Sequence, residues 1–62
     1  MKISFETLIK ETEDLIEYCR NNPRYYHIEK ALWSLLPDLK LEKITQINAL
    51  HALGEIEELI SK

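Results

Sequence analysis

Apolar residues recur at helical spacing in three segments of this chain, and two proline-containing stretches separate the segments. Side chains three and four positions apart share one face of an α-helix, so this period indicates amphipathic helices rather than strands. Asn22-Pro23 divides the first segment from the second, and Pro37 closes the second, because a residue before proline disfavours the helical region. The pattern predicts an all-α chain with helices over about residues 5–20, 23–36 and 40–60.

Local signals support these helix ends. Ser4 is expected to cap the first helix, with Glu6 near the positive end of the helix dipole. Asn22 and Pro23 suit the N-cap and first positions of the second helix. Asp38 is the best cap available to a third helix that begins near residue 40.

The chain has 62 residues, which is enough for a single helical domain over residues 1–62. Short connections make consecutive helices antiparallel neighbours, so we expect an antiparallel three-helix bundle with a long C-terminal helix. A core of this size rarely supplies more than about 3–5 kcal/mol of stability. Because Cys19 is the only cysteine, no intrachain disulfide can add to it, and self-association is the expected compensation.

The third helix carries more apolar surface than one core requires. From Leu41 to Leu59 an aliphatic residue stands at every third position. Steps of three fall short of a helical turn by about 60°, so this stripe travels around the helix. Either Gly54 divides the segment into two angled pieces, or one continuous helix serves both a core and an interface. We predict the continuous helix, in a homodimer or larger oligomer.

Charge and hydropathy narrow the class of protein. The formal net charge of −3 opposes a general nucleic-acid surface, which needs a basic patch. The residues after Lys2 do not resemble a secretory signal, and no apolar run approaches the length of a membrane span. A lone cysteine suits a reducing compartment. We therefore expect a small acidic cytoplasmic protein that does not enter a membrane.

Few residues offer catalytic chemistry. His51, Glu55 and Glu58 share one face of the third helix, but they are too few to close a metal site. Cys19 lies on the apolar stripe of the first helix, which favours a small core residue over a nucleophile. One glycine cannot make a glycine-rich phosphate loop. The sequence therefore predicts a non-enzymatic protein with no catalytic residue, no cofactor and no metal.

Aromatic residues indicate where a partner binds. Tyr26 and Trp33 stand seven positions apart on one flank of the second helix, with Lys30 between them. Such rings are frequent interface anchors, and Lys30 suits a cation–π contact. Alternatively, the third helix folds over this flank and both rings form the edge of the core. We predict a partner-binding surface that combines this flank with the outward side of the third helix. Its residues are Tyr26, Lys30, Trp33, Leu41, Ile44 and Ile47.

Together these features predict a protein–protein interaction or regulatory module that docks through helix faces. We expect it to act as a homodimer and to bind another protein. The alternative is a helix-turn-helix-like DNA-binding regulator, in which Lys40, Lys43 and Gln46 at the start of the third helix meet phosphates and a base edge. The connection before that helix lacks the usual glycine, and the helix is heavily apolar. Nucleic acid is therefore the less favoured partner.

Overall fold

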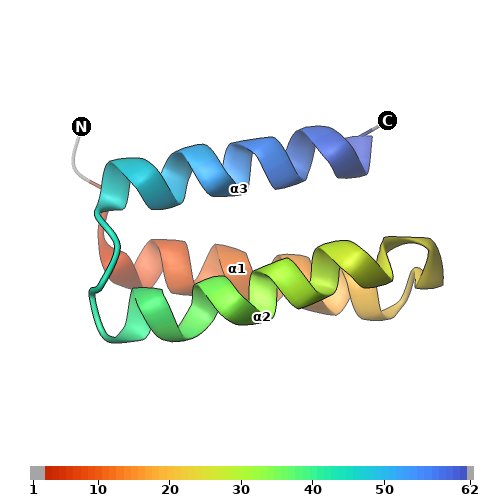
Figure 1. Ribbon diagram of the computed structural model, residues 1–62, viewed down its shortest axis with the longest axis horizontal. Helices are drawn as coiled ribbons and strands as arrows, with labels where there is room; N and C mark the ends of the chain where they lie inside the picture. Colours follow the sequence, from red (N-terminus) through yellow and green to blue (C-terminus); the bar gives the residue numbers. More distant parts are fainter. Residues whose placement is uncertain (1–2, 62) are drawn as a thin grey trace.

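The computed structural model describes residues 3–61, and its regular elements over that range are all helical. They are α1 (Phe5–Arg20), the 3-10 turn η1 (Pro23–Tyr25), α2 (Tyr26–Lys40) and α3 (Gln46–Ser61). The three α-helices pack together, with the α1–α2 connection at one end and the α2–α3 connection at the other (Figure 1). The prediction of an all-α fold is confirmed.

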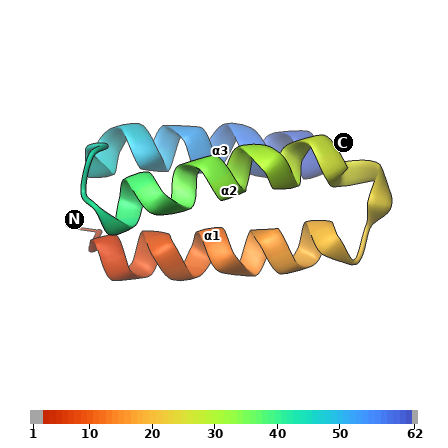
Figure 2. The same cartoon turned by 60° about the horizontal axis from the view of Figure 1, so that its bottom comes forward.

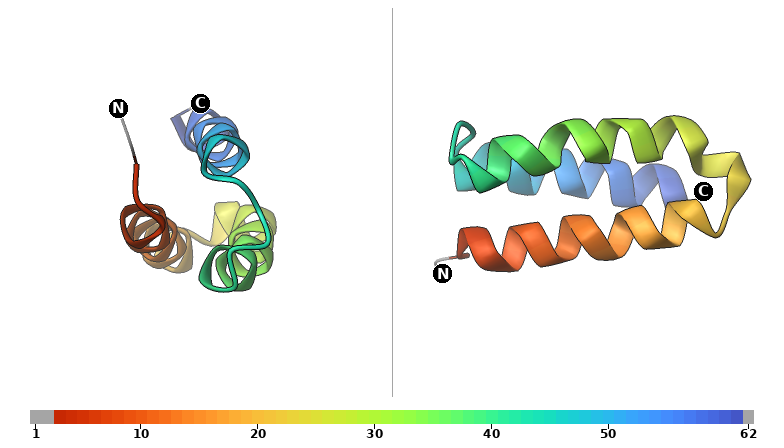
Figure 3. Two further views of the ribbon diagram at one scale, coloured as in Figure 1. Left: turned by 90° about the vertical axis from the view of Figure 1, so that its left-hand side faces the viewer. Right: turned by 90° about the horizontal axis from the view of Figure 1, so that it is seen from below.

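The helices are arranged as a pair covered by a third. Figure 2 shows α1 and α2 running side by side along their lengths. The end-on view in Figure 3 places α3 against one side of this pair and leaves the opposite side open. The core between the helices consists mainly of leucine. Its buried apolar residues are Leu8, Ile16, Cys19, Leu32, Leu35, Leu36, Leu39, Ala49 and Leu53.

Helix α1 begins where the sequence predicts. The Ser4 hydroxyl accepts a hydrogen bond from the Thr7 amide at 3.2 Å, which satisfies one of the free N–H groups of the first turn. Thr12 is a polar residue in the core, and it is fully buried. Its hydroxyl donates to the Leu8 carbonyl at 2.7 Å, so the buried oxygen has a partner within its own helix.

The predicted start of the second helix at residue 23 is wrong. Pro23–Tyr25 forms a 3-10 turn, and the α-helix begins at Tyr26. The Asn22 side chain does not cap this 3-10 turn. The side-chain amide of Asn22 instead donates to the Tyr18 backbone carbonyl at 2.7 Å, because the last carbonyls of α1 have no partners within that helix.

The predicted end of the second helix at Leu36 is also wrong. Helix α2 continues through Pro37 to Lys40. Proline removes one backbone donor, but Pro37 lies on the exposed side of α2. One more turn places Leu39 in the core with no exposed surface. Burial of a leucine is worth about 1.5–3 kcal/mol, which outweighs the local preference of the residue before proline.

Helix α2 ends in a Schellman arrangement. The Lys43 amide donates to the Asp38 carbonyl at 2.8 Å, and the Glu42 amide donates to the Leu39 carbonyl at 3.2 Å. Glu42 adopts a φ of 54°, the left-handed conformation that glycine usually supplies at this position. Asp38 therefore lies inside α2, and the prediction that it caps the third helix is wrong.

Helix α3 begins at Gln46 rather than near residue 40. Thr45 provides its cap, because its hydroxyl accepts from the Asn48 amide at 3.2 Å. The helix continues through Gly54 to Ser61, so the prediction of an unbroken helix is confirmed.

Both ends of α3 are tied to the rest of the chain by hydrogen bonds. At its start, the side-chain amide of Gln46 donates to the Ile3 backbone carbonyl. Near its end, the Tyr25 hydroxyl donates to the Ile60 carbonyl at 2.9 Å, and the Tyr25 ring stacks on Tyr18 with centroids 5.9 Å apart. These contacts place α3 lengthwise over the α1–α2 pair.

We predict opposite outcomes for two neighbouring leucines at the end of α2. Leu39→Ala should cost about 2–5 kcal/mol of unfolding free energy, because it leaves a cavity in a core that has no exposed surface at this point. Leu41→Ala should change stability by no more than about 0.5 kcal/mol, because that side chain is 65% exposed. Urea denaturation followed by circular dichroism measures both. Equal losses would contradict the extension of α2 past Pro37.

Candidate partner-binding site

Tyr26 and Trp33 lie on the surface of α2, where 57% and 50% of their respective areas are exposed. Helix α3 does not cover them, so they are not the edge of the core, the alternative that the sequence left open. Lys30 places its ammonium group 5.0 Å from the centroid of the Tyr26 ring, which is a cation–π distance. The Trp33 indole donates to Glu29 at 3.0 Å, and this bond restrains the ring.

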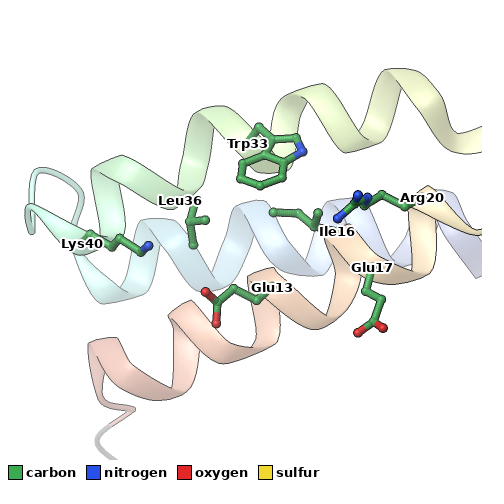
Figure 4. Close-up of a pocket in the computed structure, with 7 residues that line it drawn as sticks. All are labelled: Glu13, Ile16, Glu17, Arg20, Trp33, Leu36 and Lys40. Atoms are coloured by element: carbon green, nitrogen blue, oxygen red, sulfur yellow. The ribbon is translucent and has the colours of Figure 1, made fainter.

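Trp33 stands at the side of an open groove between α1 and α2 (Figure 4). The groove has a volume of about 410 Å³. Ile16 from α1 and Leu36 from α2 supply apolar side chains beside the indole, and the α3 ribbon lies behind them. The groove therefore occupies the side of the helix pair that α3 leaves open.

Charged side chains surround this apolar strip. Glu13 and Glu17 come from α1, with Arg20 one turn further along the same helix, and Lys40 comes from the end of α2. An apolar centre with a polar margin is the usual composition of a protein–protein contact surface. We call the seven lining residues the Trp33 groove. They are Glu13, Ile16, Glu17, Arg20, Trp33, Leu36 and Lys40.

The remaining residues of the predicted surface lie elsewhere. Leu41 is in the turn after α2 and is exposed. Ile44 is half-buried and packs against the core. The prediction that it points outward is therefore wrong. Ile47 is exposed on α3, where it borders a separate shallow hollow of about 320 Å³ together with Leu50 and Gly54.

The sequence does not mark Ile16 and Leu36 as site residues, because their helical spacing indicates only that they belong to the core, where both are indeed buried. Which side of the α1–α2 pair remains open depends on where α3 lies, and no local pattern encodes that. The signal for Leu50 is present in the sequence, since it belongs to the aliphatic series at every third position of the last helix.

The residues with potential catalytic or ligand chemistry are Cys19 and the group of His51, Glu55 and Glu58. Cys19 is almost fully buried, and burial, with the nearby charge of Glu29, raises the pKa of its thiol. The buried thiol is therefore neutral and shielded from substrates. Among residues 3–61, no group of three or more His, Cys, Asp and Glu side chains has a geometry suited to a metal ion. His51, Glu55 and Glu58 instead border the hollow on α3.

Two acidic side chains meet between α1 and α3, Glu11 from α1 and Glu57 from α3. The protonated Glu11 carboxyl can donate a hydrogen bond to the Glu57 carboxylate, and this raises the pKa of the half-buried Glu11. Partial desolvation and the charges of Glu57 and Asp14 raise it further. A carboxyl with a raised pKa binds its proton more tightly in the folded state than in the unfolded chain. This contact therefore opposes the packing of α3 on α1 when both groups are ionised.

We predict that Glu11→Gln stabilises the fold at pH 7 by up to about 1 kcal/mol, the range for partly exposed charge pairs. In the native sequence, this contact should add stability as pH falls through the raised pKa of Glu11 towards its ordinary value of 4.5, because the folded state is protonated first. Glu11→Gln should remove that gain.

Thermal unfolding between pH 4 and 8 measures the effect. Glu13→Gln is the matched control, since Glu13 is exposed on the same helix. An equal response from both variants would contradict a specific Glu11–Glu57 contact.

The chain matches no protein-family model, and no curated protein or solved structure is similar enough to indicate a relationship. Over residues 3–61, no helix has both the length and the apolar character needed to cross a membrane.

Proposed function

We propose that this chain is a non-catalytic protein–protein interaction module, an antiparallel three-helix bundle that docks through its helix faces. In this proposal it acts as a homodimer and binds another protein through the Trp33 groove. The observation that carries the proposal is the half-exposed Trp33 at the side of an open groove, whose apolar floor is formed by the nearly buried Ile16 and Leu36. Trp is among the residues most enriched at the energetic centres of interfaces.

The energetics of a small core support this function. Exposed apolar area costs about 25 cal/mol for each Å² that stays in contact with water. A bundle with so few buried side chains has little stability to spare, yet it exposes Trp33, Tyr26, Ile47 and Leu50. Contact with partners recovers that free energy. The inaccessible Cys19 thiol is consistent with a role in packing rather than catalysis.

The margin of the Trp33 groove indicates the chemistry of its partner. Glu13 and Glu17 border the α1 side, so a segment with basic side chains suits that edge. The apolar strip suits one or two aliphatic or aromatic side chains from the same segment. An amphipathic helix provides both kinds of side chain on adjacent faces.

The helix-turn-helix alternative finds no support in the geometry. Lys40 ends α2 and Lys43 lies in the connection, so the prediction that both belong to the start of the third helix is wrong. Gln46 does begin α3, but its side chain donates to the Ile3 carbonyl. These three side chains therefore do not lie on one helix, as the alternative requires.

We predict that Trp33→Ala weakens partner binding by about 2 kcal/mol or more, because it removes the aromatic anchor of the groove. The variant should keep its helical circular dichroism spectrum, since half of the side chain is already exposed. The measurement is affinity capture from the native host followed by mass spectrometry, with the wild type and the variant processed in parallel.

Tyr18→Ala is the matched control for this experiment. Tyr18 is also an aromatic residue with about half of its area exposed, but it lies on α1 beside Tyr25 and outside the groove. It should retain the partner that Trp33→Ala loses. Unchanged capture by the Trp33 variant, or its unfolding, would refute the assigned surface.

A further inference from the structure

Helix α3 carries a second apolar stripe, which points away from the core. Ala49 and Leu53 face inward and are buried, whereas Ile47 is 69% exposed and Leu50 is 44% exposed. Gly54 follows Ile47 by two helical turns and lies on the same side. A Cβ atom placed on Gly54 would meet nothing within 4 Å. Within the described chain, this stripe of Ile47, Leu50 and Gly54 is therefore uncovered, with open space at its glycine.

Charge is distributed unevenly along the same helix. Lys40 and Lys43 are exposed before α3 begins, with the exposed Glu42 between them, so this end has one positive charge in excess. The exposed charged residues in the second half of α3 are all acidic: Glu55, Glu57 and Glu58. The helix dipole is oriented in the same direction as these side-chain charges, with its positive end at Gln46 and its negative end at Ser61. A surface of this kind complements its own reversed copy. A parallel copy would place like charges together.

We propose that a second copy of this chain covers the stripe, with α3 packed antiparallel on α3 across a twofold axis between Leu50 and His51. A single register then satisfies three pairings. Ile47 of one copy lies over the open space at Gly54 of the other, and Leu50 lies against His51. Lys43 faces Glu58, which pairs opposite charges at both ends of the contact.

This interface rests on the homodimer of the proposed function and specifies its contact surface. A twofold axis makes each pairing occur twice, so a few side chains contribute double. The Trp33 groove lies on the side of the bundle opposite α3 (Figure 3, Figure 4). The dimer therefore leaves two Trp33 grooves open, and self-association and partner binding use different surfaces.

Gly54→Gln tests the interface directly. Sedimentation at micromolar concentration should give twice the chain mass of 7.4 kDa for the wild type and the single-chain mass for this variant. Glutamine has a higher helix propensity than glycine and meets no atom of its own chain at the Cβ, so the variant should stay folded. In the dimer, its side chain occupies the space that Ile47 of the second copy needs.

Leu59→Gln is the matched control, because Leu59 is an exposed apolar residue of α3 that does not border the Ile47–Gly54 hollow. It should remain dimeric. Ile47→Asp should raise the dimer dissociation constant by at least about 30-fold, as expected for a central interface residue.

A charge exchange tests the antiparallel register. Lys43→Glu alone and Glu58→Lys alone should each raise the dissociation constant by about three- to tenfold at low salt. The double variant should restore it, because each copy again faces the opposite charge. Failure of this rescue would overturn the register.

A monomeric wild type at micromolar concentration, or a dimeric Gly54→Gln variant, would overturn the interface. Neither result would refute the proposed function if capture of a partner still depended on Trp33. Conversely, a dimer that dissociates on Gly54→Gln would support this interface even if Trp33→Ala captured the same proteins as the wild type.

Discussion

Burial of leucine side chains between three short helices is the constraint on which the rest of this structure depends. Leu8, Leu32 and Leu39 have no exposed surface, and each is supplied by one of the two paired helices, α1 and α2. The extension of α2 past Pro37 and the position of α3 both follow from enclosing these side chains. Because the enclosed volume is small, other apolar residues of the same chain remain at its surface.

Helix caps and apolar spacing in the sequence predict the parts of the fold that depend on contacts between near neighbours in the chain. Helix α1 was located correctly because Ser4 provides its own cap and the apolar spacing is regular. The boundary between α2 and α3 was misplaced because Pro37 gives a strong local signal to stop, while the reason to continue is the burial of Leu39 against residues distant in sequence. The left-handed Glu42 was also hidden, since glutamate carries no preference for that conformation.

In the candidate site, too, some features follow from local sequence and others depend on how the helices pack. The spacing of Tyr26, Lys30 and Trp33 predicted one flank of α2, and that spacing is a property of the helix itself. The groove needs Ile16 from α1, whose pairing with Trp33 across the two helices depends on how they are rotated and on the side that α3 leaves open. The sequence predicts that Ile44 points outward because it predicts a third helix that begins earlier than α3 does.

Trp33 is the only tryptophan in the chain, and this gives the molecule an intrinsic optical probe at its groove. Because half of the surface of Trp33 is already exposed in the folded state, its emission should change little when the helices unfold. A ligand that seats in the groove transfers the ring to an apolar environment and shifts the emission to shorter wavelength. Fluorescence of the unlabelled chain thus reports occupancy of the groove more strongly than it reports folding.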